Sequence, residues 1–114
     1  MDTWQVRLTN GSHYGNIEEM RVISRRAIRT FSERHTDALG PLAHWANAVE
    51  SADWRTPGDA RKTFNTADFV SNLAVFDVGG NKYRVITFVQ YRRKLVYIKE
   101  VLTHHEYGKG AWRP

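Results

Sequence analysis

Two strands separated by a tight turn can be recognised directly in the C-terminal half of this sequence. Residues 73–78 (LAVFDV) and 82–91 (KYRVITFVQY) are rich in β-branched and aromatic side chains, which favour extended backbone. Between them stands Gly79-Gly80-Asn81, and glycine and asparagine tolerate the positive φ angles of a hairpin turn. A third run of the same kind follows at residues 95–102 (LVYIKEVL). The chain is therefore predicted to fold around an antiparallel β-meander.

The first half of the chain changes to helical spacing of its apolar residues. A short strand is expected at residues 21–23, after which Ser24 is placed to cap a helix. A second helix is expected with Asp37 as its cap, and Thr56-Pro57 is expected to start a third, short one. Residues 65–72 are predicted to be a loop. These elements predict an α+β fold, a compact two-layer domain in which an N-terminal helical hairpin packs on the β-meander.

Length and composition limit the organisation of the protein. The 114 residues suffice for one hydrophobic core, and 41% of them are hydrophobic, so a single folded domain is expected over residues 20–114. Residues 1–19 have no sustained periodicity and are expected to form a loosely attached leader. No run approaches the roughly 18 apolar residues of a membrane span, and we expect a cytoplasmic protein without a membrane partner. The absence of cysteine excludes disulfides, thiol nucleophiles and Cys-ligated zinc.

Positive charge is concentrated at the C-terminal end. The net charge of the chain is +5, but residues 82–113 carry eight Lys or Arg against two Glu, a local balance of +6. Such an excess attracts polyanions, of which nucleic acid is the commonest in a cell, although a plain solvated surface would show the same pattern. The basic residues that we expect to contact RNA are Arg61, Lys62, Arg92 and Arg93.

Alternation along the second strand places Lys82 and Arg84 on one face together with Ile86. If the loop to the next strand has two or four residues, Lys99 lies opposite Ile86 and joins them. An odd loop would put Glu100 there instead, which would favour an ordinary charge-compensated surface. A face with three cations cannot be the core, because an unpaired buried charge is too costly.

The last strand is followed by Thr103-His104-His105-Glu106-Tyr107. Thr103 and Glu106 have the spacing of a capping box, so one turn of helix is expected, with His104 and Tyr107 on one side of it. Cleavage of RNA by its own 2′-hydroxyl needs a base, an acid and cations, and these residues supply all three without a metal or another cofactor. We expect Arg84 and Lys99 to stabilise charge, and His104 and Tyr107 to be the acid and base. Each could instead be an ordinary surface or core-edge residue.

Two long motifs resemble HigB-type toxins of type II toxin–antitoxin systems. They are NLAVFDVGGNKYRVI (residues 72–86) and YIKEVLTHHEYGKGAW (residues 97–112), and MRVISRRAIRTF and DWRTPGDARKTF resemble the start and middle of the same family. The resemblance covers residues 20–112. It implies a fold similar to RelE toxins, and cleavage of messenger RNA, typically on the translating ribosome. It also implies an antitoxin partner of the helix-turn-helix HigA type. By position, it implicates Arg84, Lys99, His104, Tyr107 and, less directly, Lys82.

Two other functions are compatible with these features. A binding toxin that inhibits gyrase would share the general fold without needing an acid and a base. A non-catalytic RNA-binding module would use the cations alone and would not be toxic.

Overall fold

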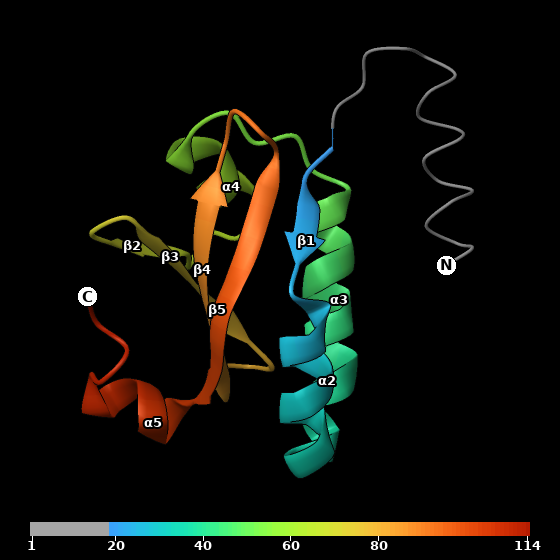
Figure 1. Ribbon diagram of the computed structural model, residues 1–114, viewed down its shortest axis with the longest axis vertical. Helices are drawn as coiled ribbons and strands as arrows, with labels where there is room; N and C mark the ends of the chain where they lie inside the picture. The colour runs from blue at the N-terminus through green and yellow to red at the C-terminus, as the bar shows by residue number, and fades with distance from the viewer. Residues whose placement is uncertain (1–18) are drawn as a thin grey trace.

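The computed structural model describes residues 19–114, so the predicted leader lies almost wholly outside the described residues. Five strands form one mixed sheet in the order β1-β5-β4-β3-β2 (Figure 1). Their bounds are β1 Arg21–Ile23, β2 Asp68–Val70, β3 Leu73–Val78, β4 Tyr83–Gln90 and β5 Leu95–Thr103. The helices are α2 Arg25–Arg34, the 3₁₀ turn η1 Thr36–Ala38, α3 Leu39–Glu50, α4 Pro57–Thr63 and α5 His104–Lys109.

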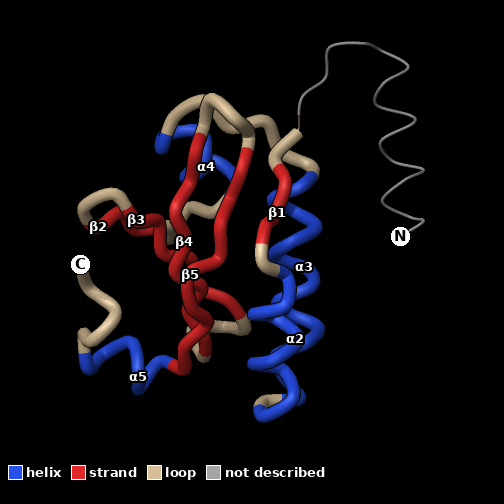
Figure 2. The backbone as a smooth tube through the Cα atoms, viewed as in Figure 1, coloured by secondary structure: helices blue, strands red, loops and turns tan. Residues whose placement is uncertain are grey.

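The predicted meander is confirmed, and the sheet is larger than predicted. Strands β3, β4 and β5 pair antiparallel in sequence order. Strand β1 pairs parallel to the start of β5, and β2 pairs antiparallel to β3, so the prediction of a loop over residues 65–72 is wrong. The α+β class is confirmed, with α2 and α3 forming one layer beside the sheet (Figure 2).

The helix-packed face of the sheet forms the main core. Helix α3 buries Leu42, Trp45 and Val49, and Phe76 of β3 packs against both Trp45 and Trp54. These side chains are at most 2% exposed, so burial of apolar surface holds the helices on the sheet.

Among the first three predicted helices, two caps are wrong and the predicted start of the third is confirmed. Ser24 stands at the N-cap of α2 in the left-handed region (φ 76°) and makes no capping hydrogen bond. Asp37 lies inside η1, where its carboxylate binds Lys82 and Tyr83 instead of capping α3. Thr56 caps α4 as predicted, because its hydroxyl accepts a hydrogen bond from the Asp59 backbone N–H.

The opposite face of the sheet is covered only in part. Leu73, Val75 and Ile86 form a second, smaller cluster, and Trp112 of the C-terminal tail packs on it. Helix α5 continues directly from β5 and carries the tail to this face (Figure 1). This arrangement places the His104–Tyr107 segment beside Arg84 of β4.

Candidate active site at the end of the sheet

Arg84 is the centre of the site, and it is buried rather than presented to solvent. Only 7% of the residue is exposed, on the face of β4 that also carries Ile86. Across the hairpin it pairs with Asp77, whose Oδ1 lies 2.9 Å from Arg84 Nε. A buried guanidinium is tolerated only when it is paired and hydrogen-bonded, and Asp77 supplies the opposite charge.

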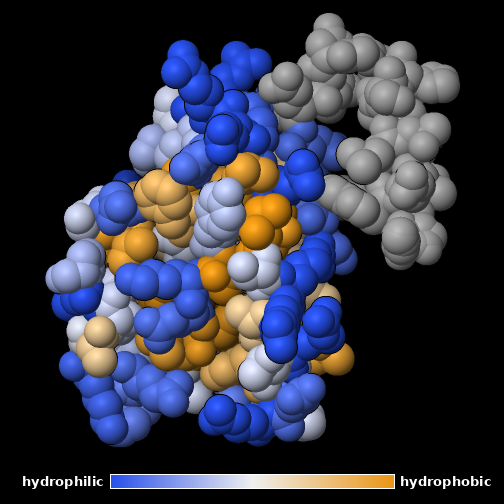
Figure 3. Space-filling model, in the orientation of Figure 1, coloured by the Kyte–Doolittle hydropathy of each residue, from blue (hydrophilic) through white to orange (hydrophobic). Residues whose placement is uncertain are grey.

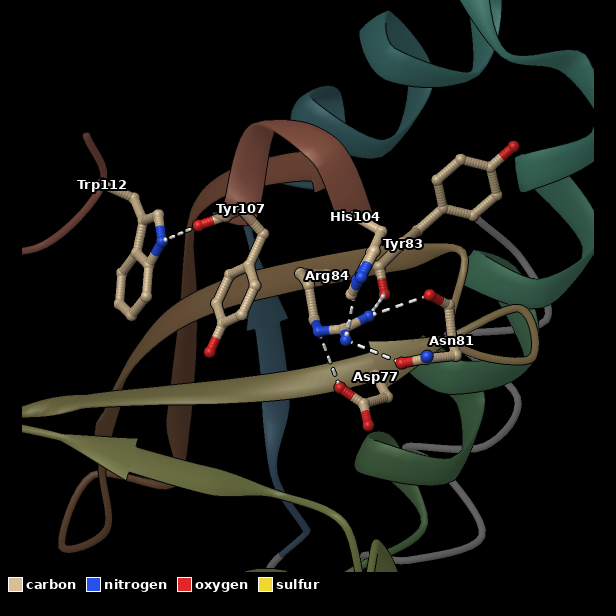
Figure 4. A network of polar contacts seen from close by, with 7 residues as sticks. All are labelled: Asp77, Asn81, Tyr83, Arg84, His104, Tyr107 and Trp112. Atoms are coloured by element: carbon tan, nitrogen blue, oxygen red, sulfur yellow. Dashed lines mark hydrogen bonds and ion pairs between the residues drawn. The ribbon is translucent and has the colours of Figure 1, made fainter. Parts of the chain in front are cut away.

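The turn before β4 supplies most of the other partners of Arg84. Asn81 adopts positive φ (76°), and both its backbone oxygen and its side chain face the guanidinium (Figure 4). Arg84 Nη1 donates to the backbone oxygens of Asn81 (3.1 Å) and Tyr83 (3.2 Å). Arg84 Nη2 donates to Asn81 Oδ1 (2.6 Å) and lies 3.1 Å from His104 Nδ1. With Asp77, these contacts occupy all five N–H groups of the arginine.

The contact with Arg84 fixes the protonation pattern of His104. Arginine can only donate, so His104 Nδ1 must accept in this hydrogen bond, and the ring proton is carried by Nε2. His104 itself is exposed at the start of α5. The site therefore presents a neutral imidazole whose Nε2–H is the ring group available to a bound molecule.

Helix α5 is held in place by the predicted capping box, which is confirmed. Thr103 Oγ1 accepts from the Glu106 backbone N–H (3.1 Å), and Glu106 Oε1 accepts from the Thr103 backbone N–H (2.9 Å). The Thr103 N–H is the main cause that lowers the pKa of the Glu106 carboxyl, and the positive charges of His35 and Arg34 lower it further. The first turn of α5 is thereby fixed at the end of β5.

Replacing Thr103 with alanine should loosen this turn. We expect a loss of about 1 kcal/mol in the free energy of unfolding, because one N-terminal N–H of α5 loses its acceptor. Urea unfolding measures the loss, and Thr103→Ser, which keeps the hydroxyl, is the control. Equal stability of the alanine variant and the parent would show that the box does not hold α5.

Tyr107 is sandwiched between a cation and an aromatic ring. The Arg84 guanidinium lies 5.0 Å from the centre of the Tyr107 ring, and Trp112 stacks on that ring at 4.9 Å. The indole N–H of Trp112 also donates to the Tyr107 backbone oxygen (2.8 Å). The C-terminal tail thus fixes Tyr107 beside Arg84 and His104 (Figure 4).

Three residues of this site were not expected from the sequence: Asp77, Asn81 and Trp112. The register of the first hairpin contained a signal for Asp77 alone. A four-residue connection centred on Gly79-Gly80-Asn81 places Asp77 directly opposite Arg84, as observed. Asn81 could be read as a turn residue but not as a partner of Arg84.

The prediction that Lys82 shares a face with Arg84 is wrong. Lys82 belongs to the turn, and its Nζ lies 2.6 Å from Asp37 Oδ2, on the helix side of the sheet. The Tyr83 hydroxyl donates to the other oxygen of the same carboxylate (2.6 Å). Both hydrogen bonds lower the pKa of Asp37, and the bond from Lys82 has the larger effect. The Asp37 carboxylate in turn raises the pKa of Lys82.

The lowered pKa of Asp37 predicts how stability depends on pH. The stabilisation should be fully present above the ordinary pKa of an aspartate and lost as the pH falls through the lower folded-state value. Asp37→Asn should therefore remove acid-sensitive stability. Unfolding free energies measured from about pH 2 to pH 7 test this. Parallel curves for parent and variant would contradict it.

Lys99 does not lie opposite Ile86. The connection of residues 91–94 has the even length that would place it there, but a β-bulge shifts the register between Ile86 and Thr87. Glu100 pairs with Ile86 and Ile98 with Thr87, so Lys99 is the extra, exposed residue of the bulge. The sequence gives no signal for a bulge at this point.

The four residues expected to contact RNA lie at the other end of the hairpin. Arg92 and Arg93 are exposed in the β4–β5 turn, and Lys62 is exposed on α4, 3.9 Å from Asp59. Arg61 donates to the Ala67 backbone oxygen and stacks over Phe69. The length of β5 separates the turn from α5, roughly 27 Å at the usual rise per residue of a strand (Figure 1).

Within residues 19–114, no three His, Asp or Glu side chains converge as metal ligands would, and the sequence has no cysteine. No helix in this part of the chain is long and apolar enough to cross a membrane.

The small two-layer α+β domain is consistent with the RelE-like fold that the sequence predicted. The family model described as HigB_toxin, the RelE-like toxic component of a toxin–antitoxin system, matches residues 38–110. The chain belongs to this family of HigB toxins.

Two curated relatives show the extent of the similarity. The chain is 29% identical over 91 residues to the mRNA interferase toxin HigB of Escherichia coli strain K12. The aligned region covers 77% of this chain and 88% of the relative. It is 27% identical over 93 residues to the mRNA interferase HigB of Escherichia coli O6:H1, with 79% and 90% covered. The family match includes Arg84, His104 and Tyr107.

Proposed function

We propose that this toxin is an endoribonuclease that cleaves messenger RNA, and that the site formed by Arg84, His104 and Tyr107 performs the reaction. Its relatives are named mRNA interferases, which supports the activity. The observation that carries the assignment of the site is the contact between a buried, fully hydrogen-bonded arginine and an exposed histidine. Because a hydrogen bond at one ring nitrogen sets the tautomer, the Arg84 contact leaves Nε2 of His104 as the ring nitrogen that can act on a bound molecule.

The proposed reaction uses the 2′-hydroxyl of the RNA as the nucleophile. Its oxygen forms a bond to phosphorus while the bond from phosphorus to the 5′-oxygen breaks. One proton leaves the 2′-hydroxyl and one is delivered to the departing 5′-oxygen. The products are a 2′,3′-cyclic phosphate and a 5′-hydroxyl, so the step is balanced without a metal or a redox partner.

The tautomer of His104 suggests its part in the reaction. With Nδ1 occupied by Arg84, the Nε2–H of His104 is placed to donate a hydrogen bond to the departing 5′-oxygen and to stabilise the negative charge that develops there, and the proton that this oxygen finally takes up comes from solvent water. Tyr107, on the same side of α5, is then the group proposed to take part in removing the proton of the 2′-hydroxyl. Arg84 contacts both residues and orients them.

Arg84 is therefore proposed as a positioning residue, not as a phosphate ligand. All five of its N–H groups have protein partners, and none is left for a phosphate oxygen. The expectation that Arg84 stabilises charge on the phosphate directly is revised accordingly.

Two further features of the proposal come from the family rather than from the site. The toxin should act on messenger RNA bound to the ribosome, and a helix-turn-helix antitoxin of the HigA type should neutralise it. A toxin–antitoxin family implies an antitoxin partner in any case.

Analysis of the reaction products tests the proposed function. The protein is incubated with a defined messenger RNA, free and on translating ribosomes, in the presence of EDTA. We expect fragments with 2′,3′-cyclic phosphate and 5′-hydroxyl ends. Intact RNA under both conditions, or loss of gyrase supercoiling in a parallel assay, would overturn the proposal.

A further inference from the structure

A groove of about 760 Å³ lies between α2 and the second half of β5. Strand β1 pairs with β5 only at Leu95–Tyr97 and then gives way to α2, so from Ile98 onward the outer edge of β5 has no neighbouring strand among the described residues. The groove follows this edge and ends at Glu106 of α5, two residues after His104. Arg84, His104 and Tyr107 do not line the groove, but its end at Glu106 lies in the same short helix as His104 and Tyr107.

Cations from two elements line the groove. Arg26, Thr30 and Arg34 follow one another at intervals of four residues on α2, so they share one side of that helix. Lys99 approaches from the bulge of β5, on the other side of the groove. All three cations are exposed, and within residues 19–114 none of them forms an ion pair.

Between the cations the lining is apolar and includes an aromatic ring. Phe31 is half-buried and stacks on His35 with ring centres 4.4 Å apart. In Figure 3 hydrophobic side chains gather over the strands and hydrophilic ones border them on the α2 side. The apolar residues that line the groove are Ala27, Phe31, Ile98, Val101 and Leu102.

Two carboxylates also line the groove, and they restrict where an anion can lie. The Glu106 carboxylate accepts the Thr103 N–H, and its pKa is lowered by that bond and by the nearby charges of His35 and Arg34. Glu100 is half-buried at its position opposite Ile86. An anionic ligand is thus directed towards the α2 cations and Lys99.

We propose that this groove binds the single-stranded RNA substrate next to the bond that is cleaved. Single-stranded RNA presents phosphates and flat apolar bases together, and the groove offers cations and an apolar, partly aromatic surface together. Arg26, Arg34 and Lys99 contact phosphates, and bases lie on the surface around Phe31. The inference rests on the proposed function, because it identifies the path by which the substrate reaches His104.

Binding of a fluorescein-labelled, mixed-sequence RNA of about 12 nucleotides tests the groove. Anisotropy is measured at several salt concentrations in a His104→Ala background, which keeps the probe intact. The groove variant combines Arg26→Ala, Arg34→Ala and Lys99→Ala. The matched control combines Arg21→Ala, Arg29→Ala and Arg55→Ala, which removes three exposed charges that do not line the groove.

We expect the groove variant to bind weakly, with the slope of log K against log salt reduced by roughly 2, about 0.7 for each lost phosphate contact. The control should keep the slope of the parent. With His104 restored, the groove variant should show a raised KM for the same RNA. Circular dichroism establishes that both variants are folded.

Three results would overturn the inference. They are a parent that does not bind the RNA, a control that loses as much affinity as the groove variant, and a groove variant that binds like the parent. The last would indicate that the groove receives a protein. Failure of the proposed function would give a different result. The protein with His104 intact would then bind the RNA in the groove but would not cleave it.

Discussion

Replacing His104 with alanine should lower kcat/KM for RNA cleavage by about 10²- to 10³-fold, the range expected for the loss of one hydrogen-bond donor to developing negative charge. Expression of the variant should no longer arrest growth. The fold should persist, because His104 is exposed and, within residues 19–114, its side chain forms a hydrogen bond only with Arg84. Primer extension on a target transcript and colony formation after induction measure the two effects.

His105 provides the control for this substitution. It is the same residue type at the next position, it is exposed, and it lies outside the contacts of Arg84. His105→Ala should cleave RNA like the parent. If His104→Ala remained fully toxic, or if the two variants lost activity equally, His104 would not be the reacting histidine.

The second large effect is expected at Arg84. Arg84→Ala should lose roughly 3 kcal/mol of stability, because Asp77 and Asn81 lose their buried partner. This is the lower end of the usual range, since the Asp77 side chain is 31% exposed and can reach solvent. The rate of cleavage should also fall, because His104 Nδ1 loses the hydrogen bond from Arg84 that fixes the tautomer of the ring.

Arg84→Lys separates a positioning role from a role in phosphate binding. Lysine keeps the charge, but its single nitrogen cannot reach Asp77, Asn81 and His104 together. We therefore expect the lysine variant to cleave no better than the alanine variant. The ¹⁵N shifts of His104 should show a protonated Nε2 in the parent and a mixture of tautomers in the variant. Substantial activity with lysine would indicate direct contact with phosphate.

The parts of the site that follow local rules could be predicted from the sequence. The Gly79-Gly80-Asn81 turn depends on backbone freedom at adjacent residues, and the capping box depends on the spacing of Thr103 and Glu106. Both were confirmed. His104 and Tyr107 were placed correctly on one turn of helix for the same reason.

The parts that depend on distant residues could not be predicted. Ion pairing with Asp37, 45 positions away, draws Lys82 to the helix side of the sheet. The bulge that displaces Lys99 arises from pairing between β4 and β5, and a period of two cannot reveal it. Asp77 reaches Arg84 only through the hairpin register.

Charge clustering along the chain was a poor guide to charge clustering in space. The excess of positive charge near the C-terminus suggested that Arg92 and Arg93 lie close to the site, but the full length of β5 separates them from His104. Helix α2, seventy positions before α5, brings Arg34 near Glu106. The fold therefore gathers cations for the site from the helix layer as well as from the hairpin.

The central claim is that His104, oriented by Arg84, donates a hydrogen bond from Nε2–H to the departing 5′-oxygen and stabilises its negative charge. Cleavage of an RNA whose scissile 5′-oxygen is replaced by sulfur tests it most directly, because a thiolate departs without such stabilisation. The account predicts that His104→Ala recovers most of its lost rate on this substrate while Tyr107→Phe remains slow. An equal defect of His104→Ala on the oxygen and sulfur substrates would contradict it.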